Sequence, residues 1–503
     1  MKAQEKLAES LLRVKKIAKM NGAPIIRSEQ IARADRELLV RTKWLQEIIK
    51  GWYLFLKPSI PDGDSSAWYA NFWDFLRIYL TYHFRNNYCL SAEASLDLHT
   101  ASSVIPEQVI VISSKGGGAP QGLPFNTSFF VYSDPKNIPD EKVALRGLEV
   151  MTLPYALCKV SPTYFQKNQK EAEIALQLIR NSSDLIEVLL KYNFQSAAAR
   201  LIGAYAACKN KKFVTEIQHA VQESGWKIKE ENPFIHAPLL QTRFQSPYVA
   251  RIYALWNEFR PVVIQHFPKP PGILKNQKTY FTKLAAIYDK DAYNSLSIEG
   301  YEVDEELIAH VQSNQWSPEE NPRDAQERDA LAARGYYEAF LDVKKSILRI
   351  FENENPGVVV EEDLKKWYQS LFAPLARAGI IQRSELFGYR KMQVYIRGSR
   401  HVPLPREALA DAMDALFQLL QNEQESSVRA VLGHYMFVFI HPFMDGNGRL
   451  GRFLMNAMLA SGGYPWTIIQ TKHRATYFQA LETAGTEKNI EPFVRFILQE
   501  MGR

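Results

Sequence analysis

The sequence predicts a mainly α-helical protein with an α+β N-terminal part. Apolar residues recur at helical spacing in several parts of the chain, and residues 431–440 are apolar on every face, which is typical of a buried helix. Runs rich in β-branched and aromatic residues at 109–112 and 128–132 predict strands in the first half of the chain. Helices therefore dominate, and most of the predicted strands lie toward the N-terminus.

The first 57 residues are expected to form helices followed by a β-hairpin. The predicted elements are an amphipathic helix over 7–20, a second helix from Glu29 capped by Ser28, a third over 37–44 capped by Asp35, and a hairpin over 48–55 that turns at Lys50 and Gly51. Helices followed by a hairpin wing are the order of a winged-helix domain. The sequence therefore predicts a winged-helix-like basic domain over residues 1–57.

Positive charge is concentrated in the same part of the chain. Residues 1–60 contain 13 Lys and Arg against 6 Asp and Glu, a net charge of +7, whereas the whole chain has a net charge of +6. Basic side chains on such a domain can bind DNA phosphates. A winged helix that serves packing or protein contact is the alternative, and the sequence leaves both open.

Residues 58–215 are expected to form a mixed α/β domain, with helices such as 171–191 after the strands. The layout of the N-terminal domain, together with residues 88–99 and 106–113, resembles AbiEi-type antitoxins. The resemblance implies an antitoxin-like N-terminal part. Residues 216–275 are predicted to connect this part, through helices and a proline-rich end, to the C-terminal domain.

One loop of the C-terminal domain, residues 441–449, combines residue types that suit phosphate chemistry. It has the sequence His-Pro-Phe-Met-Asp-Gly-Asn-Gly-Arg, and Arg452 follows within the next helical turn. Pro442 ends the buried helix before the loop, and another helix begins near Leu450. The N-terminus of that helix and the backbone N–H groups around the glycines are then expected to face one anion.

The polar side chains of this loop fit a nucleoside triphosphate and a hydroxyl nucleophile. His441 can accept a proton at neutral pH, because imidazole has an ordinary pKa of about 6.5. Asp445 supplies the kind of oxygen ligand that Mg²⁺ prefers. Arg449 and Arg452 supply forked donors for phosphate oxygens. Phe443 is expected to point back into the protein as an apolar anchor.

Residues 441–452, HPFMDGNGRLGR, resemble the signature of the Fic family, HPFx[DE]GNGRxxR, at every fixed position. The resemblance implies an all-α Fic domain over 276–503 that transfers AMP from ATP to a Ser, Thr or Tyr hydroxyl of a target protein or of itself. It implies His441 as the general base and Asp445 as the Mg²⁺ ligand. The implied nucleotide-binding residues are Gly446, Asn447, Gly448, Arg449, Leu450, Gly451, Arg452 and Tyr477.

Two of these positions carry further implications. The related Doc kinases have lysine where Gly448 stands, so Gly448 favours AMP transfer over phosphorylation. Residues 473–481 resemble the later Fic helix whose aromatic residues lie at the nucleoside, and Tyr477 is the candidate there.

Residues 388–396 resemble the Fic flap, a β-hairpin over the active site. Val394 and Ile396 are expected on one face of a strand, and Gly398–Ser399 at the turn. A target segment could add to this edge as a further strand, which would place its hydroxyl near the base.

A second motif concerns regulation. Residues 295–300, SLSIEG, fit the inhibitory pattern [ST]xxxE[GN] of one Fic class, within a helix expected over about 282–300. In that class the glutamate pairs with the second arginine of the loop. The resemblance thus implies that Ser295 and Glu299 inhibit the enzyme and that Glu299 pairs with Arg452.

The predicted function is a self-inhibited protein adenylyltransferase that uses ATP and Mg²⁺. Two alternatives stay open: a DNA-binding regulator or antitoxin-like protein with an idle Fic site, and an AMP-removing or phosphate-transferring variant. Three scattered cysteines, a polar N-terminus and the lack of long apolar runs predict a cytoplasmic protein without membrane contact. The sequence leaves a homodimer open.

Overall fold

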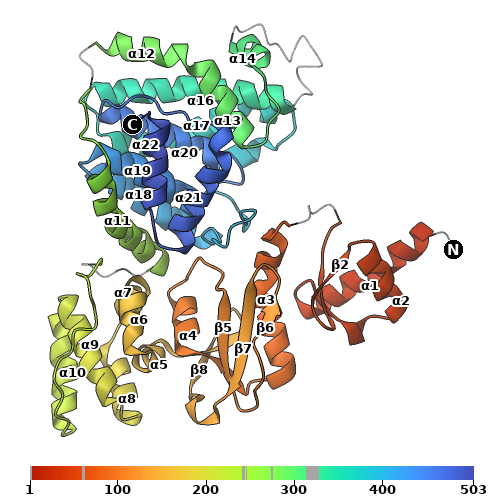
Figure 1. Ribbon diagram of the computed structural model, residues 1–503, viewed down its shortest axis with the longest axis vertical. Coiled ribbons are helices and arrows are strands. Elements are labelled where there is room, and N and C mark those ends of the chain that lie inside the picture. Colours follow the sequence, from red (N-terminus) through yellow and green to blue (C-terminus); the bar gives the residue numbers. More distant parts are fainter. Residues whose placement is uncertain are drawn as a thin grey trace. The chain divides into compact units, whose positions relative to one another are not determined.

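The computed structural model describes residues 3–58, 63–240, 244, 246–273, 276–312 and 328–502. Two compact units are present: Met1–Ala250 with Tyr395–Val402, and Arg251–Val394 with Pro403–Arg503. Within the described ranges the first unit holds all the named strands, and the second is helical (Figure 1). The mainly α fold with an α+β N-terminal part is therefore confirmed. The sequence analysis divides the chain into four parts, more than these two units, and the boundaries of the four parts stay predictions.

The N-terminal segment has the predicted order of helices followed by a hairpin. Its elements are α1 (Ala3–Asn21), β1 (Ile25–Arg27), the 3-10 turn η1 (Ser28–Gln30), α2 (Arg33–Arg41), β2 (Leu45–Ile49) and β3 (Trp52–Phe55). The strands form an antiparallel sheet in the order β1-β3-β2. Gly51 lies at the turn between β2 and β3 with a φ of 83°, which glycine adopts without strain.

Two helix starts predicted in this segment are wrong. Ser28 opens a single 3-10 turn, and α2 begins at Arg33, earlier than expected. Asp35 does not cap a helix, because it is buried in the first turn of α2. There it accepts hydrogen bonds from Ser10 Oγ at 2.6 Å and from Arg13 Nε at 2.8 Å, which join α2 to α1. The hydrogen bonds from Arg13 lower the pKa of the Asp35 carboxyl.

A mixed four-stranded sheet lies at the centre of the first unit. Its segment contains α3 (Ser66–Phe84), β4 (Tyr88–Leu90), α4 (Ala92–His99), β5 (Gln108–Ser113), β6 (Gln121–Leu123), β7 (Thr127–Ser133), η2 (Pro135–Asn137), β8 (Lys142–Leu145) and β9 (Leu148–Met151). The sheet order is β4-β5-β7-β6, with β5 and β7 parallel and side by side (Figure 1). Both predicted strands, at 109–112 and 128–132, are thus present. The hairpin β8-β9 shares a buried core with the aromatic face of α3.

The next helices of the first unit are α5 (Leu153–Lys159), α6 (Pro162–Lys167), α7 (Gln169–Leu178), α8 (Ser182–Lys191), α9 (Gln195–Ala207) and α10 (Lys211–Glu223). The single helix expected over 171–191 is wrong, because the chain leaves α7 after Leu178. Asn181 starts α8 instead, and its side chain accepts a hydrogen bond from the Ser183 N–H at 3.2 Å. Asparagine is a strong N-cap, and here capping outweighs the continuity of the apolar pattern.

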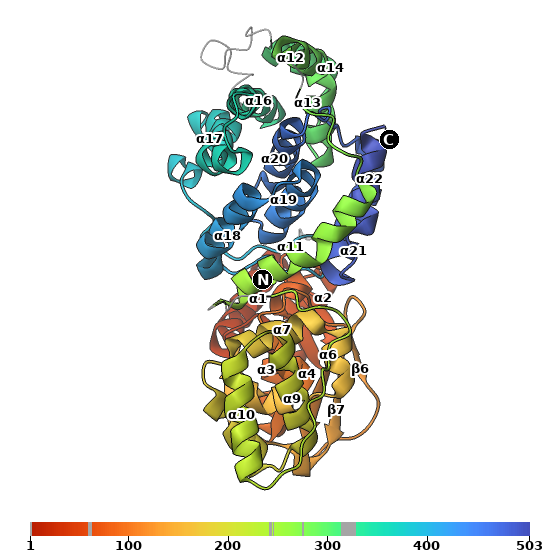
Figure 2. The same cartoon turned by 90° about the vertical axis from the view of Figure 1, so that its left-hand side faces the viewer.

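The second unit is a helical bundle around α19. Its elements are α11 (Pro247–His266, which begins in the first unit), α12 (Gln277–Ala286), α13 (Tyr288–Ile298), α14 (Glu305–Gln312), α16 (Arg328–Phe351), α17 (Pro356–Arg377), η3 (Arg383–Leu386), η4 (Arg406–Ala408), α18 (Leu409–Asn422), α19 (Ser426–Ile440), α20 (Asn447–Ser461), η5 (Thr471–His473), α21 (Arg474–Thr486) and α22 (Glu491–Glu500). As predicted, α19 is buried on nearly all of its residues. Figure 2 shows α16 beside α17, with both helices seen nearly end-on. A Cβ on Gly335 of α16 would clash with the Leu371 carbonyl of α17, so glycine permits this close packing. None of the described helices is long and apolar enough to cross a membrane.

The helix expected over about 282–300 is broken at Ile287, which separates α12 from α13. Ile287 has φ −106° and ψ 0°, outside the regular helical range. Asp289 and Asp291 lie in the first turn of α13, where acidic side chains stabilise a helix N-terminus. The motif residues Ser295 and Glu299 therefore belong to α13 and its C-terminal cap.

The ion pairs of α2 generate a prediction about the stability of the N-terminal segment. Replacing Asp35 by Ala should destabilise the packing of α1 against α2 by about 1–3 kcal/mol. The substitution removes the buried carboxylate, so Ser10 and Arg13 lose their charge-assisted hydrogen bonds to it. The measurement is hydrogen–deuterium exchange of the amides in β1 and α2, which should become faster. The matched control is Glu37→Ala on the same helix, because Glu37 and its partner Arg33 are both exposed. Equal exchange in the two variants would contradict this assignment.

Candidate active site

The loop between α19 and α20 brings the predicted catalytic residues to the N-terminus of α20. His441 follows α19 in a left-handed conformation, with φ 54° and ψ 61°. Pro442 has no N–H and cannot continue the helix. Gly446 caps α20 with φ 81°, and a Cβ there would lie 2.7 Å from the Phe372 ring. Glycine is therefore required at this position both by conformation and by space.

Asn447 braces the loop with its side chain. Its Oδ1 accepts a hydrogen bond from the Phe443 N–H at 3.0 Å, and its Nδ2 donates to the Phe443 carbonyl at 2.8 Å. Phe443 stacks on Tyr368 of α17, with ring centroids 3.9 Å apart and planes 9° from parallel. The loop is thus fixed to the bundle at Phe443 and is closed on itself by Asn447.

The imidazole of His441 is oriented by the backbone of α19. Its Nδ1 lies 3.3 Å from the Val438 carbonyl oxygen. Because a carbonyl only accepts, this contact places the proton on Nδ1 and leaves the lone pair on Nε2. Burial lowers the pKa of His441 to about 4. The ring is therefore neutral at physiological pH, and its Nε2 can accept a proton.

Arg390 holds the backbone of this loop from the segment predicted to be the flap. Its side chain is buried, and its Nε donates to the His441 carbonyl at 2.8 Å. Its backbone N–H donates to the Pro442 carbonyl at 2.9 Å. The two remaining guanidinium nitrogens donate to the carbonyls of Met392 and Leu404. One buried guanidinium thus ties both arms of the flap segment to the residue that carries the imidazole.

Arg449 is a buried cation whose guanidinium has no hydrogen bond to any residue that the structure describes. The side chain is 0% exposed. Its charge is balanced by Asp445, whose Oδ1 lies 3.3 Å from Nη2. The guanidinium also lies 5.0 Å from the centroid of the Tyr301 ring and 5.1 Å from that of Phe372. Buried polar groups are normally hydrogen-bonded, so these unused donors indicate a site for an anion.

Arg452, one turn further along α20, is bound by α13. Its Nε donates to Ser295 Oγ at 2.9 Å, and its Nη2 donates to the Ser295 carbonyl at 3.0 Å. The same Nη2 forms an ion pair with Glu299 Oε1 at 2.8 Å. Both residues of the predicted inhibitory motif therefore contact the second arginine of the loop.

The Glu299 carboxylate also lies at the first turn of α20. A Cβ on Gly448 would collide with Glu299 Oε1. The carboxylate therefore lies beside the backbone expected to bind phosphate, at a helix N-terminus where negative charge is favoured. Gly300 follows with a φ of 88°, which turns the chain so that Tyr301 reaches Arg449. Glu299 thus covers Arg452, and Tyr301, two residues later in the chain, covers Arg449.

Three residues of α13 make further hydrogen bonds that hold it in this position. The buried Asp291 carboxylate accepts hydrogen bonds from Tyr336 at 2.7 Å and from Trp466 at 2.9 Å, and burial raises its pKa to about 6. The side-chain oxygen of Asn294 accepts a hydrogen bond from the Thr471 N–H at 2.8 Å. At the C-terminal end, the Ile298 carbonyl accepts one from Arg474 at 2.7 Å.

Asp445 is the one carboxylate of the loop. Its side chain is 51% exposed, and its Oδ1 accepts a hydrogen bond from the Gly446 N–H at 2.6 Å. The described residues contain no group of three or more His, Cys, Asp or Glu side chains that could hold a metal ion. A single exposed carboxylate fits Mg²⁺ that takes its other ligands from water and from the phosphates of a nucleotide.

Three predicted nucleotide-binding residues lie away from the loop surface. Leu450 is 0% exposed, and Gly451 packs against α19, where a Cβ would lie 3.1 Å from Val438. Tyr477 is buried on α21, and its hydroxyl is 2.8 Å from the His434 ring nitrogen. Leu450 and Gly451 pack into the bundle behind the site, whereas Tyr477 also interacts with Arg452. The neighbouring Phe478 is 39% exposed, so it is the more accessible aromatic residue of α21.

The β-hairpin predicted for the flap is wrong. Residues 388–402 contain no named strand, so Val394 and Ile396 do not lie on a ladder. A turn is present, closed by the Ser399 N–H on the Ile396 carbonyl at 3.1 Å, one residue earlier than expected. Side-chain hydrogen bonds connect the arms instead of strand pairing, since Arg390 reaches Leu404 and Gln393 donates to the Pro403 carbonyl at 2.7 Å.

The tip of this segment belongs to the first unit. The Ile105 N–H donates to the Arg400 carbonyl at 2.9 Å, and the Val402 N–H donates to the Ser103 carbonyl at 2.6 Å. These bonds form an antiparallel bridge centred on His401 and residue 104. The backbone of residues 400–402 is thus already paired within the chain.

Reasoning from sequence did not assign a role to Tyr301, Arg390 or Phe372. Tyr301 directly follows the inhibitory motif, and Arg390 lies inside the flap resemblance, so both had a positional signal. Phe372 had none, because its part in the site depends on the packing of α17 against the loop.

Comparison with known proteins matches residues 359–459 to the Fic/DOC family. Two relatives with the name "Protein adenylyltransferase Fic", from Drosophila grimshawi and Drosophila mojavensis, are 45% and 44% identical to the chain over 113 residues. The matched part is 22% of this chain and 23% and 22% of those proteins, so the match spans about a quarter of their length. A solved structure, "Fic-1 (aa134 - 508) from C. elegans", overlaps with 66% of this chain and 84% of that one, at 18% identity and a TM-score of 0.37.

The family match begins in α17 and ends in α20, so it contains the whole 441–452 loop. Residues 359–459, which carry this loop, are thus the part of the chain that is similar to the Fic/DOC family.

Proposed function

We propose that this protein is an adenylyltransferase that moves AMP from ATP to a Ser, Thr or Tyr hydroxyl of a target protein or of itself. The observation that carries the proposal is the convergence of a neutral imidazole, a helix N-terminus and two buried arginines on one loop. Arg449 has unused hydrogen-bond donors, and Arg452 is neutralised by a carboxylate. The relatives named protein adenylyltransferases match the segment that carries this loop.

The proton transfer assigned to His441 follows from its tautomer. Nε2 removes the proton from the target hydroxyl as the hydroxyl oxygen attacks the α-phosphorus of ATP. A P–O bond forms to the target, the bond between the α-phosphorus and the bridging oxygen breaks, and pyrophosphate leaves. Arg390 acts as a positioning residue, because it binds the His441 carbonyl and touches no reacting atom.

The phosphates are assigned to the first turn of α20. The backbone N–H groups of residues 446–448 and the helix N-terminus stabilise their negative charge. Arg449 and Arg452 supply the side-chain donors for the β- and γ-phosphates. Mg²⁺, held by Asp445 together with the phosphates, would neutralise the charge that develops on the leaving pyrophosphate.

Self-inhibition forms part of the same proposal. Glu299 occupies the donors of Arg452 and the space beside Gly448, so its carboxylate competes with the terminal phosphate for one position. Tyr301 covers the guanidinium of Arg449 at the same time. ATP can then take a productive position only when the segment after α13 moves. DNA contact through residues 1–57 is a separate expectation that rests on the basic charge of that segment.

Removing the Glu299 carboxylate should activate the enzyme. We expect Glu299→Gly to raise AMP transfer at least about tenfold, since tenfold corresponds to about 1.4 kcal/mol and loss of a buried ion pair exceeds that. The measurement uses cell lysate, Mg²⁺ and ATP labelled at either the α- or the γ-phosphate. Glu302→Gly is the matched control, because Glu302 is exposed and lies three residues further along the chain.

His441→Ala in the Glu299→Gly background should abolish the α-label, whereas Met444→Ala, an exposed residue of the same loop, should retain it. Label from the γ-phosphate alone would favour phosphate transfer. The regulator with an idle site is favoured if no His441-dependent label appears from either position. Release of AMP from a modified target would indicate the reverse reaction.

Tyr301 should weaken ATP binding as long as its ring covers Arg449. In the Glu299→Gly background, Tyr301→Ala should lower the KM for ATP at least about threefold, because a cation–π contact is worth about 0.5–1 kcal/mol at an exposed site and more between buried groups such as these. Tyr301→Phe keeps the ring and should behave like the parent. An increase of KM in Tyr301→Ala would contradict this role, because it would mean that the ring helps to hold the nucleotide.

The pKa of His441 predicts the pH dependence of the reaction. The base works in its neutral form, which predominates above its pKa of about 4. The kcat/KM of Glu299→Gly should therefore stay level from pH 8 down to about pH 5.5 and fall only below about pH 5. Circular dichroism at each pH checks that the protein stays folded. An acid limb near pH 6.5 would show that the imidazole has an ordinary environment.

A further inference from the structure

The first unit contains a cavity of about 300 Å³ that neither the Fic loop nor the proposed reaction uses. Its walls come from three separate parts of the sequence: α3, residues 102–105 and the turn between β8 and β9. The fourth wall is formed by Tyr395 and Val402, from the tip of the flap segment that belongs to this unit. The volume lies at the lower end of the range for small-molecule sites, about 300–1,000 Å³.

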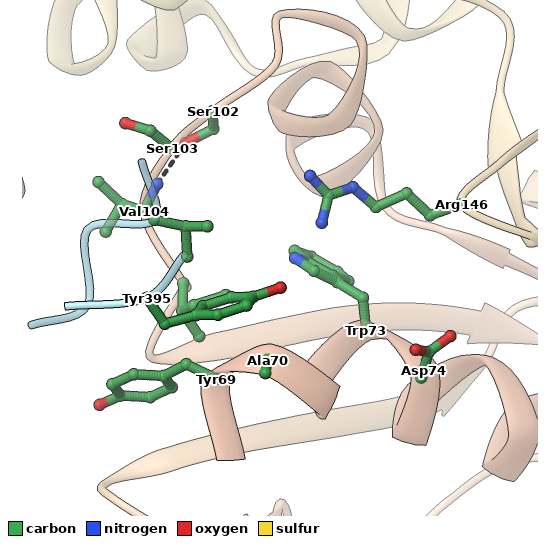
Figure 3. Close-up of a pocket in the computed structure, with 11 residues that line it drawn as sticks. Tyr69, Ala70, Trp73, Asp74, Ser102, Ser103, Val104, Arg146 and Tyr395 are labelled. Carbon is green, nitrogen blue, oxygen red and sulfur yellow. Dashed lines mark hydrogen bonds between the residues drawn. The ribbon is translucent and has the colours of Figure 1, made fainter. Parts of the chain in front are cut away.

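Aromatic rings form much of the lining. Tyr69 and Trp73 come from α3, and Tyr395 comes from the flap tip. Figure 3 shows the Tyr395 hydroxyl directed toward Trp73 across the cavity. Flat aromatic walls of this kind favour a planar ligand that can stack on them.

The polar groups of the lining are mostly hydrogen-bond donors. An indole N–H donates only, as does a guanidinium, and the lining also contains the hydroxyls of Ser102, Ser103 and Tyr395. The carboxylate in the lining, Asp74, is paired with Arg77 at 3.1 Å. The cavity therefore offers donors and a positive charge, which together suit an anion.

Arg146 supplies that positive charge. It lies in the two-residue turn of the β8-β9 hairpin, where Arg146 has φ 52° and Gly147 has φ 72°, as a type I′ turn requires. Figure 3 shows its side chain extending toward the region above Trp73. Its guanidinium forms no ion pair with a carboxylate in the described part of the chain, so its forked donors are available to a ligand.

We infer that this cavity binds a small planar ligand with one anionic group. The ring of the ligand stacks on Trp73 and Tyr395, and its phosphate or carboxylate binds Arg146. A nucleoside monophosphate and an aromatic carboxylic acid share this chemistry. Because Tyr395 and Val402 line the cavity, the ligand contacts the flap tip and stabilises its pairing with residues 103–105.

The test is isothermal titration of the full-length protein with four probes in two matched pairs. AMP is paired with neutral adenosine, and 4-hydroxybenzoate with neutral 4-hydroxybenzamide. We expect saturable binding of at least one anionic probe, at least tenfold tighter than its neutral partner. The pair that shows this difference identifies the source of the anion as a nucleotide or an aromatic acid.

Arg146→Asn separates this cavity from the Fic loop, which can itself bind AMP. Asparagine tolerates positive φ, so the turn is kept while the charge is lost. Arg85→Asn is the matched control, because Arg85 is an exposed arginine of the same unit with the same φ of 52°, outside the cavity lining. Arg146→Asn should weaken binding of the anionic probe at least tenfold, and Arg85→Asn should leave it unchanged.

Hydrogen–deuterium exchange provides the second readout and does not depend on transfer activity. The bound probe should slow the exchange of the Ile105 and Val402 amides in the wild type and not in Arg146→Asn. The inference is overturned if neither anionic probe binds, if Arg146→Asn binds as well as Arg85→Asn, or if these two amides show no protection. None of these outcomes bears on the proposed AMP transfer at residues 441–452.

Discussion

Arg452 is a buried cation that must be neutralised, and the rest of the candidate site is arranged around that requirement. Ser295 and Glu299 satisfy the guanidinium from α13, and Glu299 extends over the first turn of α20. A nucleotide phosphate is also negatively charged and suits the same helix N-terminus. On the proposed function, carboxylate and phosphate are alternatives for one position, so occupancy by one excludes the other.

This exclusion depends on how firmly α13 is held. Asp291, Asn294 and the Ile298 carbonyl each bond to a different part of the bundle, so α13 docks along its length. The segment that follows it is shorter and turns at Gly300 to bring Tyr301 onto Arg449. The proposed inhibition is thus lifted by a small movement that begins after Ile298, while α13 stays docked.

The sequence predicted the parts of the fold that depend on local chemistry. The buried α19, the loop after it and the strands β5 and β7 follow from apolar pattern and from proline and glycine positions. The helix expected over 171–191 failed through a local cap at Asn181, whereas other failures occurred where a distant contact decided the outcome. Asp35 looked like a helix cap, but Ser10 and Arg13 of another helix bind it.

The candidate site shows the same division between local and distant determinants. The residues of 441–449 could be identified because they are consecutive in the chain. The conformation of the flap segment could not be predicted from the sequence. Its residues 400–402 pair with residues 103–105, which are about three hundred positions away in the chain. Tyr477 resembles a ligand contact by position, and its ring packs against His434 and the surrounding aromatic residues; its contact with the nucleotide stays a prediction.

The most direct test of competition at Arg452 is a crystal structure of Glu299→Gly with Mg²⁺ and an ATP analogue that cannot be cleaved between the α- and β-phosphates. We expect the triphosphate against residues 446–448, with the Arg452 guanidinium within hydrogen-bond distance of the terminal phosphate. The His441 Nε2 should then face the α-phosphorus. A triphosphate bound elsewhere, with Arg452 still bonded only to Ser295, would contradict it.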